Sequence, residues 1–382
     1  MQSSLIIDNG AARRVREGEL WLPEAAVVGR RQRIPGIARL LDRRRRFVAS
    51  AFVSPGSRHY LRVISAEDAA IDGAFWRTRF ERALARRSRL FDFTDAYRVV
   101  FGESDGIPSV IVDRYADVVS FQIGCAGAES IRTDILEIVD WLLSPRAIVE
   151  RGDSEVRRSE GLPAEDRIVK GSDACAVVKE GSESFEVDAL SGQKTGAYLD
   201  YRSIRSAARE MARGDCLDAF CYQGWFSCRI AERARRVVAV DSSRPALDAA
   251  ARNAKSNAHA NIEFACQDAF DFVRGCRQSF DFIHLDPPAM AKRRQDLPAA
   301  IRRYERAALD SIAILRPGGV IMISACSQRI TERMLEGVAR SAAKASGRGC
   351  TILWRGIQDI DHPVLRSHPE SLYLKAMAVR IA

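Results

Sequence analysis

Cys326 ends the mostly apolar run VIMISAC (residues 320–326), a pattern that predicts a buried strand. Carbon 5 of a pyrimidine ring is too weak a nucleophile to take up a methyl group directly. A thiolate that adds to carbon 6 makes carbon 5 carbanion-like, so that carbon 5 can attack a methyl sulfonium and later expel the cysteine. Cys326 is therefore our candidate nucleophile. A buried cysteine that only fills space is the alternative interpretation.

The stretch LDPP (residues 285–288) ends another predicted strand with Asp286, Pro287 and Pro288. Proline fixes the backbone and removes N–H donors, so these residues would form a stiff ledge that offers a carboxylate and a carbonyl to a planar base. Variants of Asn/Asp-Pro-Pro are typical of methyltransferases that act on nucleobases. An ordinary strand-ending turn is the alternative.

Acidic residues mark the three preceding predicted strands. Asp218 lies before Gly224, which would open a helix, while Asp241 is positioned to hold two ribose hydroxyls and Asp268 to accept from an adenine amino group. The first loop lacks the GxGxxG pattern that would hold a pyrophosphate. This favours an adenosine ligand without phosphates, S-adenosylmethionine. Each acid alone could equally be a helix N-cap.

The elements that position these residues follow from the apolar periodicity. From about residue 191, five strand–helix units and two closing apolar runs predict an α/β fold. We expect a doubly wound, mostly parallel, seven-stranded Rossmann-like sheet over residues 191–382, with ligands at the carboxyl ends of its strands. Residues 1–72 predict a small β domain. Residues 73–190 predict a central α+β domain with a connector helix at its start and a polar loop at 151–173.

The positive charge is concentrated at the N-terminal end. The formal net charge is +9, and residues 1–100 hold 20 arginines, no lysine and 11 acids, a net of +9 within that segment alone. This predicts an anionic partner, with arginines 43–46 as candidate RNA contacts. A solvated face in an arginine-preferring genome is the alternative. The scatter of the nine cysteines predicts reduced thiols, and the lack of a signal peptide or apolar span predicts a cytoplasmic protein.

With these residues assembled, the chain resembles the ribosomal large-subunit methyltransferase I type of RNA 5-methylcytosine methyltransferase. The resemblance covers nearly the whole chain. Its most specific parts are YRVVFGESDGIPSVIVDRY (97–115), GQKTGAYLDYRSIR (192–205), LDAFCYQGWFS (217–227), LDPPAM (285–290), SACS (324–327) and DHPVLRSHPESLYLKAMAVRI (361–381). It implies an N-terminal PUA domain, a central domain and a class I S-adenosylmethionine-dependent methyltransferase domain that acts on large-subunit (23S) ribosomal RNA.

The resemblance also implies roles for single residues. It implies that Cys326 is the nucleophile, and Asp286 is our guess for the base that releases it. The substrate contacts that we expect come from the residues themselves: Pro287 and Pro288 from the stiff ledge, and Arg43, Arg44, Arg45 and Arg46 from the charge distribution. The residues implied to border the cofactor are Lys194, Thr195, Tyr198, Asp200, Arg202, Phe220, Gly224, Asp241, Ser242, Asp268 and Asp286. No metal is expected. The oligomeric state is left open, with a homodimer as one alternative.

Two departures from the family pattern keep other functions open. Trp225 stands where the family has glycine and could crowd the methionine end of the cofactor, and Ala289 and Met290 replace the usual Lys-Phe after Asp-Pro-Pro. One alternative is an RNA methyltransferase that acts on an amino nitrogen without a covalent intermediate. Another is a non-catalytic RNA-binding protein whose altered loop does not admit the cofactor.

Overall fold

The computed structural model describes residues 3–291 and 293–382, which divide into two compact units. The first unit comprises the chain up to Ser182 together with Val187–Leu199 and Ile360–Ser371. The second unit comprises Glu183–Glu186, Asp200–Asp359 and Leu372–Ala382. Each unit is therefore built from segments that are distant in sequence. The domain boundaries expected near residues 72 and 190 stay predictions.

The first unit begins with a six-stranded sheet in the order β2-β6-β5-β4-β1-β3. Its strands are β1 (Ser3–Ile7), β2 (Trp21–Leu22), β3 (Val27–Val28), β4 (Gly36–Leu41), β5 (Phe47–Val53) and β6 (Leu61–Ser65). A helix that was not predicted, α1 (Asn9–Arg16), buries Ala11, Ala12 and Val15 against the sheet core, and the Asp8 side chain caps it by accepting from the Ala11 N–H.

A five-stranded sheet in the order β11-β10-β9-β8-β7 follows in the same unit. Its strands are β7 (Ala96–Phe101), β8 (Val110–Tyr115), β9 (Val118–Ile123), β10 (Ala147–Arg151) and β11 (Asp166–Lys170). The helices α2 (Gly73–Ala85) and α3 (Arg132–Leu143) share a hydrophobic core with it. The predicted connector helix is therefore present as α2. The strands β12 (Cys175–Glu180) and β13 (Glu183–Asp188) come next in the chain.

The expectation of a plain loop at 151–173 was wrong, because this stretch contains α4 (Glu155–Ser159) and β11. The Ser154 side chain caps α4 by accepting from the Arg157 N–H. The polar strand β11 pairs antiparallel with β10, with Arg151 opposite Asp166. Such an edge strand needs no apolar run, since its pairing with a distant strand supplies the hydrogen bonds.

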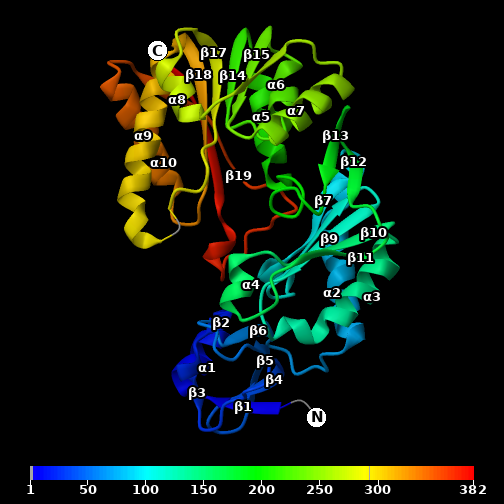
Figure 1. The fold of residues 1–382 in the computed structure, drawn as a ribbon. Helices are drawn as coiled ribbons and strands as arrows, with labels where there is room; N and C mark the ends of the chain where they lie inside the picture. The colour runs from blue at the N-terminus through cyan, green and yellow to red at the C-terminus, as the bar shows by residue number, and fades with distance from the viewer. Residues whose placement is uncertain (1–2, 292) are drawn as a thin grey trace. The chain divides into compact units, whose positions relative to one another are not determined.

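The second unit contains a seven-stranded sheet in the order β16-β15-β14-β17-β18-β20-β19 (Figure 1). Its strands are β14 (Asp215–Ala219), β15 (Arg236–Asp241), β16 (Ile262–Cys266), β17 (Phe280–Leu285), β18 (Leu315–Cys326), β19 (Cys350–Ile357) and β20 (Leu374–Ile381). The first five are parallel and β20 runs antiparallel to both of its neighbours. The predicted mostly parallel, seven-stranded sheet is confirmed.

Helices cover both faces of this sheet, with α6 and α7 on one side and α9 and α10 on the other (Figure 1). The helices are α5 (Arg202–Met211), α6 (Trp225–Ala231), α7 (Arg244–Ser256), α8 (Ala269–Gly275), α9 (Leu297–Ala313) and α10 (Glu332–Ala345). Alternation of buried strands and amphipathic helices produces this layering. All nine cysteines are thiols, as their scatter predicted. Among the described residues, no helix has the length and apolar character needed to cross a membrane.

Candidate active site

The carboxyl ends of β17 and β18 bring Asp286 and Cys326 to the same edge of the sheet. The strands are parallel neighbours with Leu285 opposite Ile323, so Asp286 follows the last pair directly and Cys326 lies three residues further along β18. Cys326 is half-buried at the strand end. The edge predicted from the sequence therefore carries both residues, and the thiol is not sealed in the core.

Tyr201 is a hydrogen-bond partner of Asp286. The Tyr201 hydroxyl donates to Asp286 Oδ1 at 2.7 Å. Burial raises the pKa of the Asp286 carboxyl to about 6, with nearby Asp218 and Asp200 adding to the rise while His284 and the Tyr201 hydrogen bond oppose it. Burial and then the charge of Asp286 raise the pKa of Tyr201 well above its usual value, so Tyr201 remains a neutral donor.

Lys375, on β20, lies opposite Ala325, the residue before Cys326 on β18. Its side chain is buried, and Nζ donates to the carbonyls of Ser327 at 3.0 Å and Leu372 at 3.2 Å. Burial lowers the pKa of Lys375 to about 8, and the negative charge of Cys326 opposes this shift. The Cys326 sulfur therefore lies within electrostatic reach of the Lys375 ammonium group.

Tyr304 of α9 also lies close to Cys326. Its ring is fully buried, and its hydroxyl has no hydrogen-bond partner among the residues that the structure describes. Burial, followed by the charges of Cys326 and Asp286, raises the pKa of Tyr304. A buried hydroxyl with no partner is costly, so it is available to donate to a bound polar group.

A buried polar network lies at the residue pair Asp218 and His284, which directly precedes the last pair of β14 and β17. His284 Nδ1 is 2.8 Å from Asp218 Oδ1, and His284 Nε2 is 3.4 Å from Ser324 Oγ. Ser227 donates to the other Asp218 oxygen at 2.5 Å, and the Phe226 ring stacks on His284 with centroids 3.5 Å apart. These contacts tie β14, β17, β18 and α6 together, which holds the edge rigid.

The loop after β14 has a tightly folded backbone. Phe220, Tyr222 and Gly224 all have positive φ angles, of 70°, 48° and 75°. A Cβ atom at Gly224 would lie only 2.8 Å from Ala250 Cβ, so glycine is required here. The Tyr222 N–H donates to Asp241 Oδ2 at 2.9 Å, which fixes the loop on the end of β15.

The carboxylates of Asp241 and Asp268 both accept hydrogen bonds from backbone N–H groups. The Asp241 oxygens accept from the Tyr222 and Ser243 N–H groups, and a carboxylate has lone pairs left for two ribose hydroxyls. Asp268 caps α8 by accepting from the Asp271 N–H at 3.0 Å, so its alternative role as an N-cap is present. Phe220 packs edge-to-face on Phe270 of α8, with centroids 4.9 Å apart, and supplies an apolar wall suited to a planar ring. This loop and these strand ends fit an adenosine ligand.

Trp225 packs inside the second unit. Its ring stacks on Phe185 with centroids 4.4 Å apart, and the Arg205 guanidinium lies 5.3 Å from the ring centroid. Only 7% of the residue is exposed. The indole is therefore held by protein side chains, and this packing gives the substitution of glycine by tryptophan a structural role.

The remaining residues implied to border the cofactor fall in both units. Lys194, Thr195 and Tyr198 belong to the first unit, whereas Asp200, Arg202 and Ser242 belong to the second. Thr195 hydrogen-bonds to Asp113 and, at 2.9 Å, to the Tyr115 hydroxyl. Lys194 Nζ lies 4.4 Å from the Tyr198 ring centroid.

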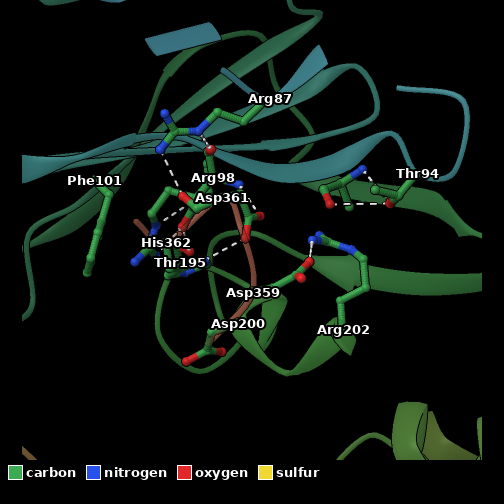
Figure 2. Close-up of polar contacts among 12 residues, drawn as sticks. Arg87, Thr94, Arg98, Phe101, Thr195, Asp200, Arg202, Asp359, Asp361 and His362 are labelled. Atoms are coloured by element: carbon green, nitrogen blue, oxygen red, sulfur yellow. Dashed lines mark hydrogen bonds and ion pairs between the residues drawn. The ribbon is translucent and has the colours of Figure 1, made fainter. Parts of the chain in front are cut away.

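Arg202 and Asp200 are tied into the second unit. Arg202 forms a buried ion pair with Asp359 (Figure 2). The Tyr373 hydroxyl donates to Asp200 Oδ2 at 2.6 Å, and the Asp359 N–H donates to the Asp200 carbonyl. Asp200 and Arg202, which belong to the motif at 192–205, are therefore both bonded to other residues of the second unit.

The motif at 361–381 is divided between the units. The Arg98 N–H donates to Asp361 Oδ2 at 3.0 Å, and the buried Arg87 guanidinium donates to the Asp361 carbonyl at 2.8 Å (Figure 2). Arg87 also pairs with both oxygens of Asp105. The charge of Arg87, which lies in the predicted cationic connector, is therefore neutralised inside the first unit.

Arginines 43–46 form the turn between β4 and β5. Asp42 accepts from the backbone N–H groups of Arg44 and Arg46, and its carboxylate forms ion pairs with Arg46 at 2.8 Å and Arg16 at 3.3 Å. The backbone hydrogen bond from Arg46, together with these contacts, lowers the pKa of Asp42 to about 2. Part of the charge of this run is therefore compensated locally.

Sequence reasoning missed Tyr201, His284 and Lys375 as site residues. Tyr201 lies inside the motif GQKTGAYLDYRSIR and Lys375 inside the motif at 361–381, so the resemblance contained a signal for both. His284 gave no signal, because a histidine within an apolar strand has no pattern that separates a network member from a packed side chain.

Comparisons with known proteins agree with this architecture. Residues 212–366 match the family model described as a methyltransferase domain, and residues 5–66 match a PUA-like domain. The chain is 33% identical to the ribosomal RNA large subunit methyltransferase I of Alteromonas mediterranea over 394 residues, covering 100% of this chain and 99% of the relative. It is 32% identical to the protein of the same name from Yersinia pseudotuberculosis over 399 residues, covering 100% of both.

Solved structures are similar over nearly the whole chain. The methyltransferase SMU.776 in complex with SAH has a TM-score of 0.84 at 19% identity, covering 99% of this chain and 100% of that one. A SAM-dependent methyltransferase from Streptococcus mutans has a TM-score of 0.82 at 20% identity, with the same coverage. At these identities the similarity concerns the fold, and the predicted fold class of a Rossmann-like methyltransferase sheet with an N-terminal PUA-like domain is confirmed.

Proposed function

Because the chain belongs to the ribosomal RNA large subunit methyltransferase I family, we propose that it methylates carbon 5 of a cytosine in large-subunit ribosomal RNA. The observation that carries the proposal is that Cys326 and Asp286 lie at the carboxyl ends of neighbouring parallel strands, with Cys326 within electrostatic reach of Lys375. A half-buried thiol beside a cation and a carboxyl of raised pKa is suited to reversible covalent chemistry.

S-adenosylmethionine supplies an electrophilic methyl group on a sulfonium sulfur. In our proposal Asp241 accepts hydrogen bonds from the ribose hydroxyls, and Phe220 and Phe270 contact the adenine ring. The tight loop at Gly224 lets the backbone approach the ligand closely. Asp200, Arg202, Ser242 and Asp268, all in the second unit, remain proposed members of this cofactor site, and the roles of Lys194, Thr195 and Tyr198 stay predictions.

In the first step Cys326 attacks as the thiolate, and its sulfur forms a bond to carbon 6 of the cytosine. In this proposal Lys375 stabilises the thiolate before the attack, because its ammonium group lies within electrostatic reach of Cys326. The electron pair displaced from the 5,6 double bond makes carbon 5 nucleophilic. Carbon 5 then forms a bond to the methyl carbon as the methyl–sulfonium bond breaks.

In the second step Asp286 removes the proton from carbon 5. The electron pair of that C–H bond restores the 5,6 double bond, and the sulfur of Cys326 leaves as the thiolate. A carboxyl with a pKa of about 6 is a better proton acceptor at neutral pH than an ordinary aspartate, and still starts the reaction ionised. Pro287 and Pro288 fix the backbone that carries it, so the carboxylate need not reorganise.

The experiment compares product and adduct in one set of variants. Wild type with unmodified large-subunit ribosomal RNA and S-adenosylmethionine should yield 5-methylcytidine on nucleoside mass spectrometry. With RNA that contains 5-fluorocytidine, the carbon 5 proton is absent and wild type should form an adduct that survives denaturing gels. Cys326→Ala should lose both signals, and Cys350→Ala, which removes an exposed thiol on β19, should keep both.

Three results would overturn the covalent proposal. Full methylation by Cys326→Ala would show that the thiol is dispensable. An N-methylated nucleoside in place of 5-methylcytidine would favour the alternative, direct transfer to an amino nitrogen at the Asp286 ledge. Absence of both S-adenosylmethionine binding and methylation would leave only the non-catalytic RNA-binding alternative.

A further inference from the structure

A groove of about 960 Å³ lies within the first unit. One wall is the connection between β3 and β4, residues 30–37, together with the start of β1. The opposite wall includes Ile71, Ser130, Ile131 and Asp134, from the segment before α2, the turn before α3, and α3 itself. The groove is therefore shared between the N-terminal sheet and the helices of the following sheet.

The rim of this groove is basic on one side. Arg30, Arg31 and Arg33 all line it, and the carboxylate of Glu24 is 3.2 Å from Arg31 and 3.9 Å from Arg33. Glu24 thus pairs with two of the three arginines on this wall, and the Arg33 side chain remains 80% exposed. This wall carries an excess of positive charge and offers planar donors that match phosphate oxygens.

The floor is apolar and the arginine loop is anchored. Leu5, Ile71 and Ile131 form apolar lining, while Ile34 beside them is 76% exposed. The Tyr60 hydroxyl donates to the Gln32 carbonyl at 2.8 Å, and Gln32 Nε2 donates to the Ile34 carbonyl at 2.7 Å. These bonds hold the loop so that its arginines and Ile34 are presented together, which reduces the entropy lost on binding.

We propose that this groove binds an unpaired segment of the RNA substrate, with phosphates at Arg30, Arg31 and Arg33 and a base against Ile34 and the apolar floor. Asp134 and Ser130 on the opposite wall can accept hydrogen bonds from base amino groups. The inference rests on the proposed function for its ligand class, and it assigns the place of contact. A space of this size admits a few nucleotides, whereas duplex RNA is bound across a much longer surface.

The arginines of the groove are not those of the run at 43–46, which the sequence predicts as candidate RNA contacts. Arg43, Arg44 and Arg45 lie on an exposed turn, and the adjacent Asp42 compensates part of the charge of that run. Replacing three arginines of the groove, or three arginines of the turn, removes the same charge from two places in the N-terminal part. The two triple variants are therefore a matched pair.

The test uses the full chain and a short fluorescein-labelled single-stranded RNA of mixed sequence, followed by anisotropy at several salt concentrations. Arg30→Gln/Arg31→Gln/Arg33→Gln should bind about 10-fold more weakly and lower the salt slope by about 2. Arg43→Gln/Arg44→Gln/Arg45→Gln should change affinity by less than about 3-fold. Ile34→Ser should weaken binding about 3-fold, because it removes apolar contact. Val177→Ser, a substitution at another exposed apolar residue, should not.

The outcomes show whether the groove proposal fails alone or together with the proposed function. If wild type binds and methylates RNA but the groove variants bind normally, or the turn variant is the weaker one, the groove is not the contact and the proposed function stands. If duplex RNA competes as well as the single strand, the assignment to unpaired RNA is wrong. If wild type neither binds nor methylates RNA, both proposals fail together.

Discussion

The Tyr201 hydroxyl donates to Asp286 Oδ1 at 2.7 Å and links the segment before α5 to the end of β17. The pKa values of both groups are raised. Burial raises the pKa of Asp286 to about 6, and burial followed by the charges of Asp286 and Cys326 raises that of Tyr201. The hydroxyl thus orients the carboxyl without competing for its proton.

Replacing Tyr201 by phenylalanine tests this role. The hydrogen bond favours the charged carboxylate, so its loss should raise the pKa of Asp286 further above about 6. If Asp286 must be ionised to accept the carbon 5 proton, the rate of Tyr201→Phe should fall about 10-fold at pH 6.5 and recover at higher pH. Single-turnover methylation rates measured across a range of pH give the fall of the rate at low pH, which is the acid limb of the pH–rate profile. Tyr373→Phe, which removes a hydroxyl bonded to Asp200, should leave that limb in place.

Replacing Lys375 by methionine tests stabilisation of the thiolate. The ammonium group should favour ionised Cys326, so its removal should slow alkylation of Cys326 by iodoacetamide about 10-fold at pH 7. Methylation should fall by a similar factor. Mass spectrometry of the modified peptide gives the alkylation rate. Lys344→Met, at an exposed lysine of α10, is the control, and equal alkylation rates in the two variants would refute the role of Lys375.

Replacing Asp286 by asparagine should stabilise the fold while abolishing activity. The folded pKa of about 6 lies above the ordinary aspartate value of 3.8, so the native state binds this proton more tightly than the unfolded state. The stability from this group is complete below pH 3.8 and is lost as pH rises through 6. Asp286→Asn should therefore raise the free energy of unfolding by about 1–2 kcal/mol at pH 7.5, and by less at pH 4. Urea denaturation at both pH values measures the difference, and an equal gain at both would contradict the assignment.

Replacing Trp225 by glycine should destabilise the second unit without improving cofactor binding. The indole is buried between Phe185 and Arg205, and its removal leaves a cavity at the start of α6. We expect a loss of about 3–5 kcal/mol in the free energy of unfolding. Calorimetric titration with S-adenosylmethionine, below the melting temperature, should give a similar dissociation constant to wild type. A much tighter constant would show that Trp225 does crowd the cofactor. Trp225→Phe should lose less stability because it keeps a stacked ring.

Much of the second unit follows from local sequence. The alternation of apolar strands with amphipathic helices determines a parallel sheet, and residues that follow such strands must meet at one edge. Cys326, Asp286 and Asp241 could be selected for that reason alone. The arginine excess of the N-terminal part was likewise visible as composition.

Only the tertiary structure decided which side chains surround them. Lys375 reaches the Cys326 edge because β20 runs antiparallel beside β18, with Leu374 opposite Cys326, and strand order between distant segments is not encoded in local periodicity. The Tyr201 contact and the Arg30–Arg33 groove arise in the same way, since each joins residues far apart in the chain. The sequence by itself determined the strands and helices of the second unit and the reactive residues at the strand ends, whereas α1, α4 and β11 of the first unit were not predicted. Long-range packing decided the electrostatic surroundings of those ends, because burial and charge at a site depend on every element packed against it.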